Sequence, residues 1–195
     1  GERHGHDGLA DQRLMMTGFQ IKRVGHVGIW VDDLDAMEGF YKNVLGFLVS
    51  DRIVDEKVQV SYLTRNPAEH HQLVLSVNKS RSNHSSSLQN IAFRVQSLKD
   101  LKEAHNRLTQ DDAASGITAS DHGNTWSIHF QDVENNNCEI FCVTPWRVVI
   151  PFDEPLDLTK PIENIIETSR EMAYACECTK TAGEWQAETI ERLRS

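Results

Sequence analysis

The sequence has few of the residues that mark disulfide-rich or proline-rich proteins. Of its 195 residues only four are cysteine and five are proline, and aromatic residues make up 7%. The cysteines at 138, 142, 176 and 178 lack the double CxxC spacing of a structural zinc site. A disulfide framework is also unexpected in a chain of this length without a secretory signal, so we expect reduced thiols in a cytoplasmic protein.

Basic residues and long apolar runs are also scarce. Lysine and arginine number 20 against 29 aspartate and glutamate, a formal net charge of -9, which offers no attraction for nucleic acid or an anionic membrane. No apolar run approaches the roughly 20 residues of a membrane helix, and the start lacks the layout of a signal peptide. We therefore expect the protein to bind neither nucleic acid nor a membrane. We expect residues 1–18 to be a disordered lead-in.

An internal repeat organises the middle of the chain. The β-rich runs 25–31 and 89–95 each precede a helix start, and equivalent positions such as His26 and Asn90 lie 64 residues apart. Three short strand candidates follow each helix: 47–53, 57–63 and 71–77, then 116–120, 125–131 and 138–143. This pattern predicts an α+β fold of two βαβββ modules, about 22–78 and 87–147, which form a curved mixed sheet around a pocket.

The prolines mark the end of the repeat. Four of the five lie between 145 and 161, which predicts an extended strap. A helix with apolar residues Ile162, Ile165, Ile166 and Met172 on one stripe follows, and a capping box from Thr181 begins a last helix. We expect 19–147 to form one domain and 148–195 a strap with C-terminal helices. The stripe is covered either by that domain or across the two-fold axis of a homodimer.

The stretch 125–143 predicts a hairpin that pairs a histidine with a carboxylate. Ser127, His129 and Gln131 share one face of the first strand, because side chains alternate. A turn centred near Glu134 places His129 opposite Glu139, with Cβ atoms roughly 5 Å apart. A shift of one residue in register would break this pair.

Four segments, taken in order, resemble the vicinal-oxygen-chelate superfamily of glyoxalases, bleomycin-resistance proteins and dioxygenases. They are 25–31 with 40–47, 70–75, 90–93 and 129–141, and together they most resemble the type I extradiol ring-cleavage dioxygenases. The resemblance covers about residues 22–147. It implies two βαβββ modules around a metal ion and a small catechol-like aromatic as substrate.

The resemblance also assigns site residues. In that family two histidines and one carboxylate hold Fe(II) and leave positions open for a catechol and O2. By position, His26 would be the first metal ligand and Glu139 the carboxylate. His71 would be the acid–base histidine, and His122 a further histidine of the catalytic pocket.

Two departures leave alternatives open. The second histidine ligand of the family is replaced by Asn90, a weak neutral ligand, and a pocket tyrosine is replaced by His129. Either His129 supplies the lost imidazole or the site no longer uses iron. The resemblance thus implies an extradiol-type dioxygenase with Fe(II). Its alternatives are an isomerase or lyase that uses Mn, Zn, Ni or Co, and a resistance-type binding module without catalysis.

Overall fold

The computed structural model describes residues 24–56, 58–77, 88–111, 113–149 and 151–194. The expected lead-in at 1–18 lies outside these residues. The first module consists of β1 (Val27–Val31), α2 (Leu34–Asn43), β2 (Leu48–Val54), β3 (Gln59–Thr64) and β4 (Leu73–Val77). The second consists of β5 (Ile91–Arg94), α3 (Leu98–Thr109), β6 (Ser115–Asp121), β7 (Thr125–Gln131) and β8 (Asn137–Val143). The predicted α+β fold of two βαβββ modules is therefore confirmed.

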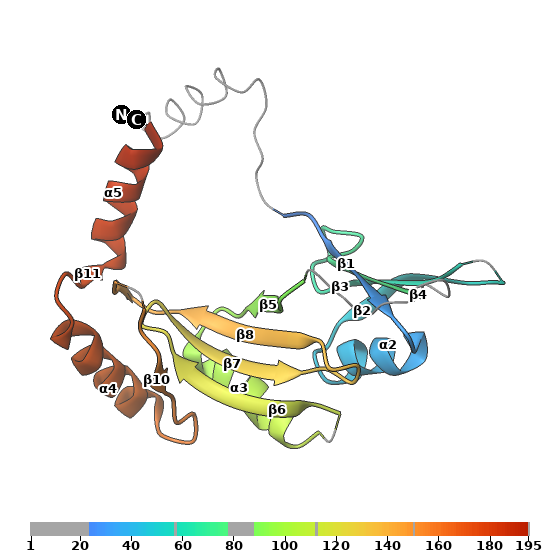
Figure 1. Ribbon diagram of the computed structural model, residues 1–195, viewed down its shortest axis with the longest axis horizontal. Coiled ribbons are helices and arrows are strands. Elements are labelled where there is room, and N and C mark those ends of the chain that lie inside the picture. The colour runs from blue at the N-terminus through green and yellow to red at the C-terminus, as the bar shows by residue number, and fades with distance from the viewer. Residues whose placement is uncertain (1–23, 57, 78–87, 112, 150, 195) are drawn as a thin grey trace, which may run out of the picture.

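The two modules build two separate sheets with the same internal order. In the first, β1 is parallel to β4 and the order is β1-β4-β3-β2. In the second, β5 is parallel to β8 and the order is β10-β6-β7-β8-β5, where β10 (Glu154–Pro155) comes from the strap. The sheets lie side by side in Figure 1, and β1 and β5 are edge strands of their sheets.

Each module covers one face of its sheet with a helix that its sequence caps. The Asp33 carboxylate accepts a hydrogen bond from the Ala36 N–H at 2.9 Å and begins α2. Ser97 does the same for Asp100 at 3.2 Å and begins α3. The buried faces of the helices carry the apolar residues that set the 3.6-residue period: Leu34, Met37, Phe40 and Tyr41 on α2, and Leu98, Leu101 and Leu108 on α3.

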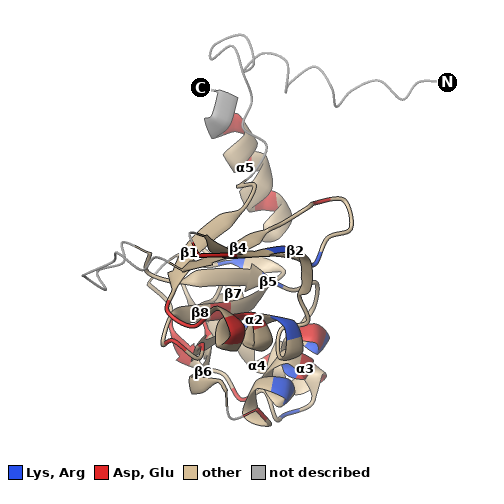
Figure 2. Cartoon of the chain, turned by 90° about the vertical axis from the view of Figure 1, so that its right-hand side faces the viewer, with Lys and Arg blue, Asp and Glu red and all other residues tan. Residues whose placement is uncertain are grey.

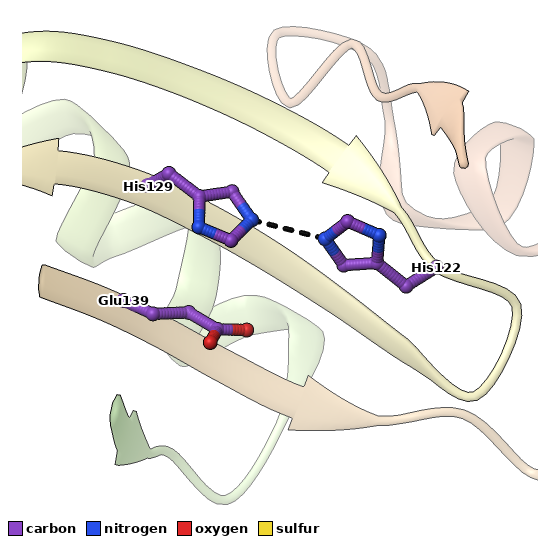
Figure 3. Close-up of side chains that lie close together, drawn as sticks. All are labelled: His122, His129 and Glu139. Atoms are coloured by element: carbon purple, nitrogen blue, oxygen red, sulfur yellow. Dashed lines mark hydrogen bonds between the residues drawn. The ribbon is translucent and has the colours of Figure 1, made fainter. Parts of the chain in front are cut away.

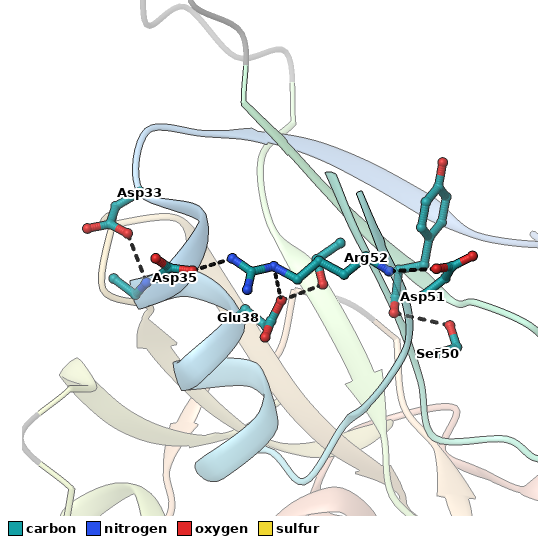
Figure 4. Close-up of polar contacts among 9 residues, drawn as sticks. Asp33, Asp35, Glu38, Ser50, Asp51 and Arg52 are labelled. Carbon is teal, nitrogen blue, oxygen red and sulfur yellow. Dashed lines mark hydrogen bonds and ion pairs between the residues drawn. The ribbon is translucent and has the colours of Figure 1, made fainter. Parts of the chain in front are cut away.

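Polar side chains tie α2 to the strands behind it (Figure 4). Arg52 on β2 contacts the carboxylate of Asp35, and its Nε lies 3.2 Å from Glu38 Oε2. Ser61 on β3 donates a hydrogen bond of 2.8 Å to the same Glu38 oxygen. Because the Glu38 side chain is only 16% exposed, these donors satisfy a carboxylate that the packing largely removes from water.

The C-terminal segment packs against the second sheet. The strands β9 (Trp146–Arg147) and β11 (Lys180–Thr181) pair with each other, and α4 (Ile162–Ala175) and α5 (Ala182–Arg194) follow the strap. Trp126 Nε1 of β7 donates a hydrogen bond of 2.8 Å to Ser169 Oγ of α4. Within the predicted apolar stripe Ile165 is buried and Ile166 stays 38% exposed, so the molecule's own sheet covers part of the stripe.

Charges are mixed along the helices. On α3, Lys99, Lys102 and Arg107 alternate with Asp100 and Glu103, and Figure 2 shows basic and acidic residues together on this helix. The charges of α3 are therefore of both signs and interspersed along the helix. Among the described residues, no helix is both long and apolar enough to cross a membrane.

Candidate functional site

The predicted histidine–carboxylate pair is present on the second sheet. In the β7–β8 hairpin His129 lies directly opposite Glu139, as the sequence register predicted. The neighbouring positions Trp126, Ile128 and Phe130 are buried in the core. Because side chains alternate along β7, Ser127 and His129 point to the opposite face, away from the core. This face carries the candidate site.

A tight turn brings His122 to the same place. His122 follows β6 directly, and the next residue, Gly123, has φ +71°, a backbone conformation that L side chains rarely adopt. The Asp121 carboxylate accepts a hydrogen bond from the Gly123 N–H at 2.7 Å, and the His122 N–H donates to the Thr125 carbonyl at 2.9 Å. These bonds hold the turn and with it the backbone of His122.

Two imidazoles and one carboxylate converge as a result (Figure 3). His122 Nε2 and His129 Nε2 are 2.9 Å apart, so one ring donates a hydrogen bond to the other. One donor atom from each of His122, His129 and Glu139 lies within 4.8 Å of the others, and all three residues are half-buried. Two donors bound at about 2.1 Å to one divalent ion lie roughly 3–4 Å apart. The three side chains therefore fit a metal ion with only small movements.

The Glu139 carboxylate is held on both sides. Ser127 Oγ donates a hydrogen bond of 2.7 Å to Oε1, and Asn90 Nδ2 donates one of 3.2 Å to Oε2. Neither donor carries a charge, so both orient the carboxylate without neutralising it. Asn90 thus lies beside Glu139 as the repeat predicts, and it contacts Glu139 through the amide nitrogen, which cannot ligate a metal. Ser127 was not among the predicted site residues, although strand alternation could have identified it.

His26 and His71 gather on the first sheet instead. Their ring centroids are 4.5 Å apart, and His70 Nδ1 lies 3.0 Å from His71 Nδ1. Loss of hydration, and then the neighbouring His26 and His70, lower the pKa of His71. Among the described residues, no hydrogen bond or ion pair joins His26 to Asn90 or Glu139. The structure thus divides the predicted residues into two groups, one on each sheet.

A cleft of about 790 Å³ separates the two sheets. His26 lines it together with apolar residues of both modules, including Phe47 and Phe93, and none of His122, His129 and Glu139 does. The cleft and the three-residue cluster are therefore different places, and the three side chains that could hold a metal ion do not line the cleft.

Comparison with known proteins identifies the family of this chain. Among solved structures, the glyoxylase/bleomycin resistance protein/dioxygenase domain from Frankia sp. EAN1pec is 21% identical, with a TM-score of 0.55 over 64% of this chain and 94% of that chain. The fosfomycin resistance protein FosX from Listeria monocytogenes, in a monoclinic form, is 19% identical, with a TM-score of 0.50 over 64% and 96%. A FosX structure with Mn(II) and sulfate is 19% identical, with a TM-score of 0.47 over 64% and 95%.

These structural likenesses concern the fold alone. A family model for the Glyoxalase/Bleomycin resistance protein/Dioxygenase superfamily matches residues 23–140, from just before β1 into β8, and so includes His129 and Glu139. The chain belongs to the Glyoxalase/Bleomycin resistance protein/Dioxygenase superfamily.

Proposed function

We propose that this protein binds a divalent metal ion through His122, His129 and Glu139 and acts there on a small molecule with adjacent oxygen atoms. The observation that carries the proposal is the convergence of the three donor groups within 4.8 Å on one sheet face. A divalent ion bound there would act as a Lewis acid on the oxygens of such a molecule. The protein's own residues supply the donor set and its orientation.

The residues around the cluster have distinct roles in this proposal. Ser127 and Asn90 hold the Glu139 carboxylate in one orientation by their hydrogen bonds at 2.7 and 3.2 Å. Without a metal ion, the hydrogen bond between the two Nε2 atoms keeps His122 and His129 close together. Metal binding requires a lone pair on each of these nitrogens, so a bound metal ion would replace the hydrogen bond between them.

A second candidate is ring cleavage by an Fe(II) dioxygenase. Two histidines and one carboxylate are the donor set of non-haem Fe(II) oxygenases, and this set favours the candidate. The position of His71 counts against it, because the histidine expected to transfer protons lies with His26 on the first sheet, their ring centroids 4.5 Å apart, and not on the sheet that carries the three donors. Oxygen uptake by the Fe(II)-loaded protein over a series of catechols separates the two chemistries, since the Lewis-acid reaction consumes no O2.

The metal site is tested by metal analysis and titration calorimetry on three variants. His129→Ala and Glu139→Gln each remove a proposed donor, so each is expected to weaken binding by more than the roughly 10–100-fold that loss of an outer-sphere partner costs. His70→Ala removes an exposed imidazole on the first sheet and is the matched control. Mn(II), Zn(II), Ni(II), Co(II) and anaerobic Fe(II) form the metal series.

Asn90→His separates the two possible positions of the site. If His129 completes the donor set, a histidine at position 90 gives little gain in affinity and removes one hydrogen bond from Glu139. A large gain, with the affinity of His129→Ala unchanged, would instead place the metal beside position 90.

The third alternative is a non-catalytic binding module. A protein that binds none of the metals, but whose melting temperature rises when small molecules are added, would support it.

A further inference from the structure

The strap that follows the second module crosses the turn that carries His122. Glu154 and Pro155 pair with Asp121 and Ser120 of β6, and the Leu156 N–H donates to the Ala119 carbonyl at 3.2 Å. A Cβ atom at Gly123 would lie 3.1 Å from the ring of Phe152, which shows how closely the strap approaches the turn. The backbone that follows residue 153 is thus held against the second sheet, and the ring of Phe152, which precedes it, lies close to the turn.

This crossing places a carboxylate behind the His122 ring. Asp153 Oδ1 lies 3.4 Å from His122 Nδ1, while His122 Nε2 faces His129 at 2.9 Å. The two ring nitrogens therefore have different partners. A carboxylate that accepts the Nδ1–H leaves the lone pair on Nε2, which is the nitrogen directed at the candidate metal position. Histidine ligands commonly have such a carboxylate on their second nitrogen, where it fixes the tautomer and the ring orientation.

We propose that Asp153 is a positioning residue, which orients the His122 ring so that Nε2 points to the metal ion. This inference rests on the proposed function of His122, His129 and Glu139 as metal ligands. The carboxylate also adds one negative charge next to a site for a cation. Because Asp153 belongs to the strap, the C-terminal segment would contribute directly to a site otherwise built from β6, β7 and β8.

The exposure of His122 and Asp153 indicates that Asp153 should affect metal affinity more than folding stability. The side chains of His122 and Asp153 are 33% and 70% exposed, and an ion pair so accessible to water contributes little to folding. An effect of Asp153 on metal affinity, without an effect on the stability of the metal-free protein, therefore distinguishes positioning from a structural role.

The experiment is a double-mutant cycle on metal affinity. Titration calorimetry with Mn(II) and Zn(II) is run on the wild type, Asp153→Asn, Asp153→Glu and Glu154→Gln. Loss of the carboxylate is expected to weaken binding roughly 10-fold or more, and Asp153→Glu to recover part of it. Glu154→Gln removes the same charge one residue away and should leave affinity unchanged. In a His122→Ala background, Asp153→Asn should have no further effect.

Two outcomes would overturn the inference in a protein that binds metal. One is an affinity of Asp153→Asn equal to that of Glu154→Gln. The other is an equal loss from Asp153→Asn with and without His122, which would indicate a general charge effect. The melting temperature of each metal-free variant is expected to match that of the wild type.

A protein that binds neither ion would contradict the proposed function. A measurement on the metal-free protein then tests whether Asp153 sets the tautomer of His122. The 15N–1H correlations of the His122 ring report which nitrogen carries the proton. The Nδ1–H tautomer is expected in the wild type and in Glu154→Gln but depleted in Asp153→Asn. The same tautomer in all three would show that Asp153 does not position the ring.

Discussion

At the residue scale, Asn90 and His129 are the two positions where the sequence departs from the extradiol pattern that it resembles. Both lie next to Glu139. Glu139 lies on β8, which is flanked by β5 on one side and β7 on the other. Asn90, which precedes β5, stands on the β5 side, and its amide donates a hydrogen bond to Glu139. His129 stands on the β7 side, directly opposite Glu139. Asn90 and His129 therefore lie on the two opposite sides of the Glu139 carboxylate.

The four free thiols differ enough to be separated by reactivity. Burial raises the pKa of Cys138 to about 12 and that of Cys142 to about 11, whereas Cys178 is exposed. Since the thiolate is the nucleophile, we expect iodoacetamide at pH 8 to alkylate Cys178 first and to leave Cys138 and Cys142 unmodified. Peptide mass spectrometry over a time course measures the order.

In denaturant all four cysteines should react at similar rates. This is the control, because it measures the reactivity of each thiol when the fold no longer buries it. Rapid labelling of Cys138 in the native protein would show that the packing of β8 against the helices is looser than the structure indicates. The expectation of reduced thiols agrees with the structure, in which all four are free.

At the scale of elements, the β6–β7 turn decides where His122 lies. Its glycine is required twice over, by a φ of +71° and by the lack of space for a side chain. A Cβ atom built at Gly123 would be 2.1 Å from Val148 Cγ2, far below any contact that real Cβ atoms show. The strap therefore packs onto a turn that only glycine can form.

Gly123→Ala is expected to lower the free energy of unfolding by at least ~2 kcal/mol, from the left-handed backbone and the displacement of Val148. Gly28→Ala is the matched control, because nothing lies within 4 Å of its Cβ position in β1. That control should be neutral or up to about 1 kcal/mol more stable. Urea denaturation followed by circular dichroism measures both. Equal stabilities of the two variants would contradict the close packing of strap and turn.

The same elements show how much of the fold was predictable. The sequence pattern predicted each strand of the modules to within two residues, and it placed a helix start after the first strand of each module. These signals are local, since each depends on residues that are neighbours within one element. The pair of His129 and Glu139 was predictable for the same reason, because a short hairpin sets its own register. The separation of the strap and helices as a unit distinct from 19–147 remains a prediction.

At the scale of the whole molecule, helix α2 joins the two modules. The hydroxyl of Tyr41, buried on α2, donates a hydrogen bond of 3.0 Å to Asp132 Oδ2 in the β7–β8 turn. In the same turn the Glu134 carboxylate accepts from the Asp33 N–H at 2.6 Å, just before α2 begins. Burial, and then Cys138 and Asp132, raise the pKa of Tyr41, so its hydroxyl stays protonated and remains a donor. The hairpin that carries His129 and Glu139 is thereby anchored to the first module.

Tyr41→Phe removes this link without changing the shape of the core. We expect a loss of about 1–2 kcal/mol in the free energy of unfolding, the range for a buried hydrogen bond. Tyr62→Phe, at a half-buried position on β3, is the control and is expected within about 0.5 kcal/mol of wild type. Denaturant titrations compare the two variants. A larger loss in Tyr62→Phe would show that the first sheet, and not the Tyr41 bond, dominates the coupling.

The sequence by itself determined the elements, the repeat and the pairing inside the last hairpin, because each follows from the period and the turns of a short stretch of chain. Only the tertiary structure decided which histidines share a site. It placed His26 with His71 on one sheet and His122 with His129 on the other, and it brought Asp153 behind His122. Such contacts depend on how sheets and the strap pack on one another, and no periodicity within a single element encodes that packing.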